Sequence, residues 1–206
     1  MKCMRKVLLI PFTFGLCFAW PTRYGQINRT EAASAVAQRA DFKLIDQDGH
    51  PFQISQLRGK LALIFFGYTT CPDACPTTLS KLSRVYKVLD DSEQKRLVTV
   101  FVSVDPGRDT PPVLKKYLAY FRINTIGLTG PKDDIDQVVR QYGAKYEIEQ
   151  SDSAAGYHIN HSTDLYLLNE RGEVAHTFKY ADGAQLIADE VRRVQRQGTD
   201  ETKRSQ

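Results

Sequence analysis

The sequence predicts an α/β protein in which helices flank a central mixed sheet, and three features of the chain carry this prediction. Residues 61–67 are a continuous apolar run and residues 97–105 are a run rich in Val, and both are typical of strands covered on both faces. Apolar residues at helical spacing follow each run. A β-hairpin and a helix are predicted to end the domain, so strands and helices alternate and an antiparallel pair joins them.

The first 20 residues have the pattern of a signal peptide or a membrane anchor. Lys2, Arg5 and Lys6 precede an uncharged stretch from Val7 to Trp20 that is short for a spanning helix. The three cations make a buried N-terminal helix a poor alternative. We therefore expect export to the periplasm, either after cleavage of this segment or with the segment anchoring the domain to the inner membrane.

Residues 21–40 are polar and show no strong period, so we expect them to form a linker. The chain has 28 basic and 24 acidic residues, and the N-terminal segment contains three of the basic ones. The rest of the chain is therefore almost neutral. It contains no basic stripe with interleaved aromatic residues, so we expect no nucleic-acid partner.

The folded domain is predicted to span residues 41–196. After the first apolar run, one helix is indicated by apolar residues at helical spacing, namely Leu79, Leu82, Val85, Tyr86 and Leu89. After the second run, a helix opens with two prolines and carries Leu114, Tyr117, Leu118 and Phe121. A short strand near 126–128 and a helix near 133–142 come next.

A hairpin over residues 164–180 is predicted to turn at residues 170–172. The last helix is predicted to run from about Ala184 to Arg196. The polar residues 197–206 then predict a disordered tail.

Two of the four cysteines, Cys71 and Cys75, lie in a short loop between the first apolar run and a helix. A helix N-terminus carries partial positive charge and unpaired N–H groups, which stabilise a thiolate. The spacing is typical of a redox pair or of two metal ligands, since a disulfide over so few residues adds little stability. We expect Cys71, in the loop, to be more exposed than Cys75, which enters the helix.

A metal site requires at least one further ligand, and the chain has four histidines. His50 and His176 are expected to be surface residues. His158 and His161 flank the start of a strand, after a polar loop that can fold over the cysteine end of the sheet, and their spacing does not choose between them. Two thiolates and one imidazole suit copper or zinc, and the lack of an evident fourth ligand favours copper.

Four segments between about Asp41 and Arg193 resemble the Sco/SenC family of copper proteins. They are "DFKLIDQDGHPFQISQLRGKLALIFFGYTTCPDACPTTLSKL", "FVSVDPGRDTPPVLKKYL", "IGLTG" and "YHINHSTDLYLLNERGEV". The T-C-P-D-x-C-P-T element with a downstream H-S is specific to that family, whereas a bare C-x-x-x-C is not.

The resemblance implies a thioredoxin-like fold and one copper ion, Cu(I) or Cu(II), bound by Cys71, Cys75 and His161. His161 is the histidine that precedes a serine at a strand start, which makes His158 a neighbour. The family usually has an acid where this chain has Asn160. Asp105, in the "DPGRDTP" loop, also matches the family, and we expect it to support the site without being a ligand.

The function implied by the resemblance is that of a copper chaperone for the dinuclear copper centre of cytochrome c oxidase. The expected partners are the copper-centre subunit of that oxidase, other copper carriers and thiol reductants, and the domain is expected to be a monomer. The alternative is an enzyme, an extracytoplasmic thiol–disulfide oxidoreductase. In that case Cys71 and Cys75 are a catalytic redox pair without a committed metal. A peroxiredoxin fits less well, because its reactive thiol needs no second cysteine nearby.

Overall fold

The computed structural model describes residues 41–151 and 156–204. The predicted signal peptide or anchor (residues 1–20) and the predicted linker (residues 21–40) lie outside the described residues. Within the two described ranges, no helix is long and apolar enough to cross a bilayer.

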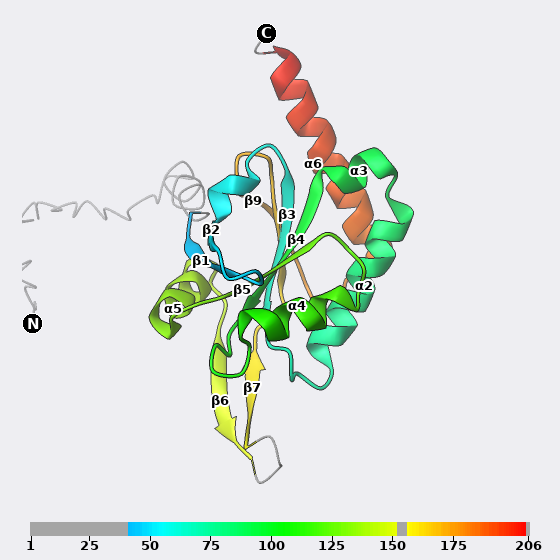
Figure 1. The fold of residues 1–206 in the computed structure, drawn as a ribbon. Coiled ribbons are helices and arrows are strands. Elements are labelled where there is room, and N and C mark those ends of the chain that lie inside the picture. The colour runs from blue at the N-terminus through cyan, green and yellow to red at the C-terminus, as the bar shows by residue number, and fades with distance from the viewer. Residues whose placement is uncertain (1–40, 152–155, 205–206) are drawn as a thin grey trace, which may run out of the picture.

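A seven-stranded mixed sheet forms the centre of the domain, with its strands in the order β2-β1-β5-β4-β3-β8-β9 (Figure 1). β3, β4 and β5 are parallel, and the other neighbouring pairs are antiparallel. The predicted α/β class with a mixed sheet is therefore confirmed. The strands are β1 (Lys43–Asp46), β2 (Pro51–Gln53), β3 (Leu61–Gly67), β4 (Leu97–Ser103), β5 (Thr125–Thr129), β8 (Leu165–Leu168) and β9 (Val174–Phe178).

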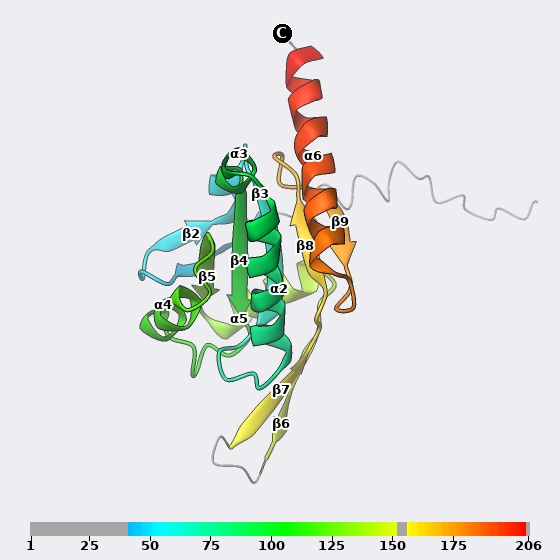
Figure 2. The same ribbon diagram turned by 90° about the vertical axis from the view of Figure 1, so that its right-hand side faces the viewer.

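Two hydrophobic cores, one on each face of the sheet, explain why β3 and β4 are apolar throughout. Every residue of both strands is buried. Successive side chains of a strand point to opposite faces. Leu63 accordingly belongs to the core under α2, α4 and α6, whereas Ile64 belongs to the core under α5 and the N-terminal strands. Figure 2 shows α2 and α6 side by side over one face. The helices are α2 (Ala74–Val88), α3 (Asp91–Lys95), α4 (Pro111–Ala119), α5 (Lys132–Gln141), α6 (Ala184–Arg204) and the short 3₁₀ helix η1 (Ile54–Leu57).

The last helix is longer than predicted, because α6 continues to Arg204 instead of ending near Arg196. The prediction of a disordered tail from residue 197 therefore fails over the part of that tail that the structure describes. Gly198 lies against the turn between β8 and β9, where a Cβ atom would be 2.6 Å from Glu170 Oε2. Glu170 is also 2.6 Å from Arg96. This packing against Glu170 stabilises the part of α6 that follows Arg196, although the sequence there is polar.

A separate two-stranded sheet, β6 (Tyr146–Gln150) paired with β7 (Tyr157–His161), extends from the end of the domain opposite the C-terminus of α6 (Figure 1). The sequence predicted a polar loop here, with two histidines flanking the start of one strand. That placement was wrong: His158 and His161 both lie in β7, and β8 begins only at Leu165. Ile159 is the one fully buried residue of these two strands, so they lack the apolar run of a core strand.

β3 ends at Gly67, where the chain enters the cysteine loop. A Cβ atom at this position would clash with Cys75 Sγ and lie 2.9 Å from Cε2 of Phe101. The absence of a side chain at Gly67 therefore leaves the space that the buried sulfur of Cys75 occupies.

We expect Gly67→Ala to lower the free energy of unfolding by about 1–3 kcal/mol, because the added methyl group displaces closely packed atoms. Chemical denaturation of the reduced apo-protein measures this change. Gly107→Ala is the matched control, since the nearest atom to its Cβ, Asp105 Oδ1, is 3.8 Å away. An equal loss of stability in both variants would contradict the steric explanation.

Candidate metal centre

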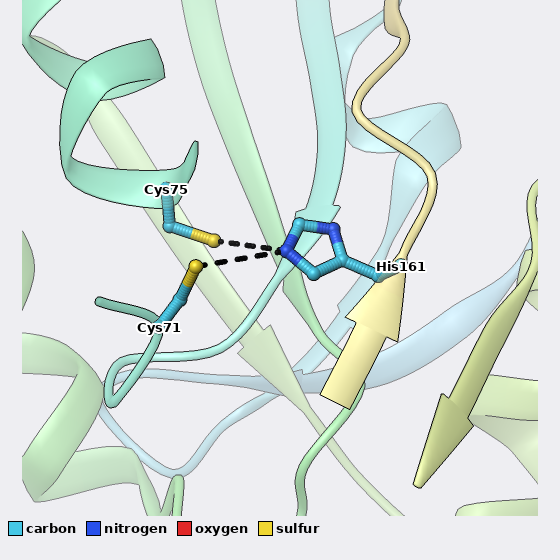
Figure 3. Close-up of side chains that lie close together, drawn as sticks. All are labelled: Cys71, Cys75 and His161. Atoms are coloured by element: carbon cyan, nitrogen blue, oxygen red, sulfur yellow. Dashed lines mark hydrogen bonds between the residues drawn. The ribbon is translucent and has the colours of Figure 1, made fainter. Parts of the chain in front are cut away.

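The side chains of Cys71, Cys75 and His161 converge beyond the carboxyl end of β3 (Figure 3). Nε2 of His161 is 3.8 Å from Cys71 Sγ and 3.5 Å from Cys75 Sγ. All three atoms lie within 4.8 Å of one another. In the part of the chain that the structure describes, no other group of at least three Cys, His, Asp or Glu side chains is close enough to hold a metal ion. The structure thus brings together the three residues that the resemblance implied.

The two cysteines differ in exposure because they lie on different elements. Cys71 is half-buried in the loop between β3 and α2, whereas Cys75 lies in the first turn of α2 and is 1% exposed. This confirms the expectation that Cys71 is the more exposed of the two. Cys71 is therefore the sulfur that a second molecule can reach from solvent.

A buried carboxylate, that of Asp109, fixes the start of the cysteine loop. Its Oδ2 accepts hydrogen bonds from the Thr69 amide at 2.9 Å and from Ser103 Oγ at 2.6 Å. Its Oδ1 accepts a third from Thr69 Oγ1 at 2.6 Å. Burial raises the pKa of Asp109, and the hydrogen bonds from Ser103 and Thr69 oppose that rise. Sequence reasoning missed Asp109, although it lies in the same "DPGRDTP" loop as Asp105.

Strand alternation in β7 determines which histidine faces the sulfurs. Residues 157, 159 and 161 are partly or fully buried, whereas residues 158 and 160 are exposed. Nδ1 of His161 donates to the Ser162 carbonyl at 2.9 Å, which leaves Nε2 to face the sulfurs. His158 lies on the outer face, 2.9 Å from Glu149. The structure thus shows that His161 faces the sulfurs and His158 does not, a choice that the spacing of the two histidines in the sequence left open.

The other candidate residues lie outside the cluster. His50 has a side chain that is 76% exposed, and His176 is a partly exposed residue of β9, as predicted for both. Asp105 is buried, but its carboxylate bonds to Arg108 and Tyr157 and not to the cysteine loop.

The two cysteines differ in the pKa of their thiols. A hydrogen bond from the Cys75 thiol lowers the pKa of Cys71 to about 3, against the effect of burial, and a hydrogen bond with His161 lowers it further. The same hydrogen bond, together with burial, raises the pKa of Cys75. Burial lowers the pKa of His161, but its hydrogen bonds to Cys71 and to the Ser162 carbonyl outweigh this and the pKa is raised. The reduced apo-site therefore holds Cys71 as a thiolate and Cys75 as a thiol.

Two thiolates and one imidazole are ligands for soft or borderline metal ions, namely Cu(I), Cu(II) and Zn²⁺. Structural zinc sites are usually closed by four protein ligands. Among the described residues, no fourth Cys, His, Asp or Glu joins the cluster. The donor set therefore matches a copper site with an open side better than a closed zinc site.

The comparison with protein-family models matches residues 30–196 to the model described as SCO1/SenC. An SCO2-like protein of Rickettsia felis is 38% identical over 161 residues, which cover 78% of this chain and 77% of that protein. The mitochondrial SCO2 homolog of Mus musculus is 33% identical over 200 residues, which cover 92% of this chain and 78% of that protein.

Solved structures show the same fold. ScoI of Bradyrhizobium japonicum with copper bound is 33% identical, with a TM-score of 0.68 over 75% of this chain and 97% of that one. BsSco, described as a member of the Sco family of cytochrome c oxidase assembly proteins, is 24% identical, with a TM-score of 0.59 over 76% of this chain and 92% of that one. These matches confirm the thioredoxin-like α/β fold that the resemblance implied.

We expect iodoacetamide to alkylate Cys71 faster than Cys75 in the reduced apo-protein, because Cys71 is the half-exposed thiolate. With a pKa of about 3, Cys71 should keep its reactivity as the pH falls to about 5, where an ordinary thiol with a pKa of about 8.5 is almost fully protonated. Mass spectrometry of timed samples measures both rates.

The matched variants for this experiment are Cys75→Ser and Cys75→Ala. A serine hydroxyl still donates a hydrogen bond to the Cys71 thiolate, whereas alanine does not, so only Cys75→Ala should move the pH profile of Cys71 upward. Faster alkylation of Cys75, or the same pH profile in both variants, would contradict the assignment.

Proposed function

This chain belongs to the SCO1/SenC family, and from that premise we propose that it is a metallochaperone that binds one copper ion through Cys71, Cys75 and His161. The observation that carries the proposal is the convergence of two sulfurs and one imidazole nitrogen within 4.8 Å of one another. Copper is the cargo of such a protein, so the site has to release the ion as well as bind it.

The protonation of the site suits uptake of a cation. Cys71 is already a thiolate, and Cys75 has to lose its proton as the ion binds, so uptake of copper releases a proton. The half-exposed Cys71 is the first sulfur that an incoming or outgoing carrier meets. Exchange of copper between proteins then proceeds by replacing one protein ligand at a time, and Cys71 is the first of the two sulfurs to be replaced.

The proposed recipient is the dinuclear copper centre of cytochrome c oxidase, and the partner is the oxidase subunit that contains it. The description of BsSco as a member of a family of oxidase assembly proteins supports this choice. Other copper carriers and thiol reductants are the proposed source of copper and of electrons. The pattern of residues 1–20 supports action in the periplasm, with the domain either released or anchored to the inner membrane.

A second candidate function, reduction of a partner's disulfide, is favoured by the lowered pKa of Cys71. A stable thiolate beside a buried second thiol is the arrangement that dithiol oxidoreductases use. Cys71 would attack the partner's disulfide, and Cys75 would then release the partner by closing a disulfide with Cys71. Two electrons pass to the partner's sulfurs in this reaction. It uses the same cysteines as copper binding but does not require His161.

We expect His161→Ala to weaken Cu(II) binding by more than the roughly 10–100-fold that loss of an outer-shell partner costs. Cu(I) binding should fall less, because two thiolates alone hold Cu(I) whereas Cu(II) prefers added nitrogen donors. Competition with Cu(I) and Cu(II) chelators under anaerobic conditions measures both affinities. His158→Ala is the control. A larger effect of His158→Ala than of His161→Ala would show that the wrong histidine has been assigned.

We also expect oxidation of the Cys71–Cys75 pair to prevent copper binding, because a disulfide removes two of the three ligands at once. In an oxidising compartment, loading would therefore require a reductant. The test is to oxidise the apo-protein, verify the loss of free thiols, and add Cu(I) or Cu(II) without reductant. Prior reduction with dithiothreitol, followed by its removal, should restore binding of one ion. Stoichiometric copper binding by the oxidised protein would refute this prediction.

A further inference from the structure

The histidine of the metal site lies on an element that requires external support. β6 and β7 form a two-stranded sheet that shares no strand pairing with the seven-stranded sheet. A two-stranded hairpin is at best marginally stable by itself in water. His161 is the last residue of β7. Its distance from the two sulfurs therefore depends on the contacts that hold β7 against the rest of the domain.

Two hydrogen bonds hold the edge of β7 that does not pair with β6. Nη1 of Arg108 donates to the Tyr157 carbonyl at 3.1 Å, and the Ile159 amide donates to the Tyr68 hydroxyl at 3.2 Å. His161 is the next residue in the same alternation. Arg108 comes from the loop after β4 and Tyr68 from the loop after β3, so these bonds connect β7 to the carboxyl ends of the two central strands.

Arg108 is itself held in one orientation. Its guanidinium carbon lies 3.7 Å from the centre of the Tyr157 ring and 5.6 Å from that of Tyr68. Its Nε pairs with Asp105, and Oδ1 of Asp105 accepts a hydrogen bond from the Tyr157 hydroxyl at 2.8 Å. A flat, stacked and hydrogen-bonded guanidinium of this kind is not reproduced by the ammonium group of lysine.

Tyr68 connects this arrangement to the metal ligand. Its ring packs edge-on against the His161 ring, with centroids 5.7 Å apart and an interplanar angle of 84°. Arg108 therefore acts on His161 by two routes, through the backbone of β7 and through Tyr68. The cysteine loop, in contrast, is held by Asp109.

We propose that Arg108 is a positioning residue. It keeps Nε2 of His161 next to the two sulfurs and so determines whether the site offers a nitrogen ligand. The copper measurements that test this inference rest on the proposed function. Arg108 itself is not one of the proposed ligands. Loss of Arg108 leaves both sulfurs in place and releases the imidazole. The consequence is selective, because Cu(II) depends on the nitrogen donor more than Cu(I) does.

The experiment compares Arg108→Lys and Arg108→Met with the wild-type full-length chain. Both variants should weaken Cu(II) binding by about 10–100-fold, the range for loss of an outer-shell partner, and leave Cu(I) binding nearly unchanged. The thiolate-to-Cu(II) absorption of both should shift toward that of His161→Ala. Combining Arg108→Met with His161→Ala should cause no further loss of Cu(II) affinity, since the two changes remove the same interaction.

Two further variants distinguish positioning from general destabilisation. Arg96→Met removes an ion pair with Glu170, 2.6 Å long, at the opposite end of β4. It should lower the stability of the fold and leave the ratio of Cu(II) to Cu(I) affinity unchanged. Tyr157→Phe removes the hydroxyl bond to Asp105 but keeps the ring against the guanidinium, so its effect should be smaller than that of Arg108→Met.

A copper-free measurement separates failure of this inference from failure of the proposed function. Amide hydrogen exchange at Ile159 should become faster in Arg108→Met, while exchange in β3 and β4 stays unchanged. Unchanged exchange at Ile159 would overturn the inference, as would an equal loss of Cu(I) and Cu(II) affinity or additive effects with His161→Ala. Normal copper binding by His161→Ala itself would instead refute the proposed ligand set, and the exchange experiment would still decide the role of Arg108.

Discussion

The parallel pairing of β3 with β4 is the constraint on which the candidate metal centre depends. Parallel strands end at the same edge of a sheet, so the cysteine loop after β3 meets the "DPGRDTP" loop after β4. Two neighbouring residues of the second loop contact different elements: Asp109 accepts hydrogen bonds from the cysteine loop, and Arg108 donates one to β7. One short loop thus supports both the cysteine loop and the strand that carries His161.

The charges of the site explain why one pair of cysteines suits two kinds of chemistry. The hydrogen bond from Cys75 lowers the pKa of Cys71, so the apo-site offers a thiolate at neutral pH without deprotonating both cysteines. A thiolate is needed both for binding a soft metal ion and for attacking a disulfide. The imidazole of His161 separates the two functions, because a nitrogen donor adds to metal binding and has no part in thiol–disulfide exchange.

The sequence predicts the parts of this protein that are specified locally. β3 and β4 were predictable because both faces of each strand are buried. The cysteine pair was predictable because Cys71 and Cys75 are only four positions apart in the chain. β6 and β7 were missed because their outer faces are exposed, although "YEIEQ" and "YHINH" alternate apolar and polar residues with the period of a strand. Asp109 was missed because a buried carboxylate has no signature in a polar loop. His161, which lies 86 residues from Cys75, was assigned only through the family resemblance.

The three proposed ligands are held with unequal firmness, and this inequality suits the proposed role of a protein that has to release its metal. Cys75 is packed in the core between Gly67 and α2, and Cys71 is tied to it through a loop that Asp109 anchors. His161 ends a two-stranded sheet that shares no strand pairing with the seven-stranded sheet and is attached by side-chain hydrogen bonds and by Ile159, Tyr146 and Tyr157 packing against the core. Local opening is easiest where few apolar contacts hold an element, so the nitrogen ligand can leave while both sulfurs remain. In the proposed copper complex, two thiolates would retain Cu(I) in that state, and the ion would stay bound to sulfur as the open side meets the next carrier.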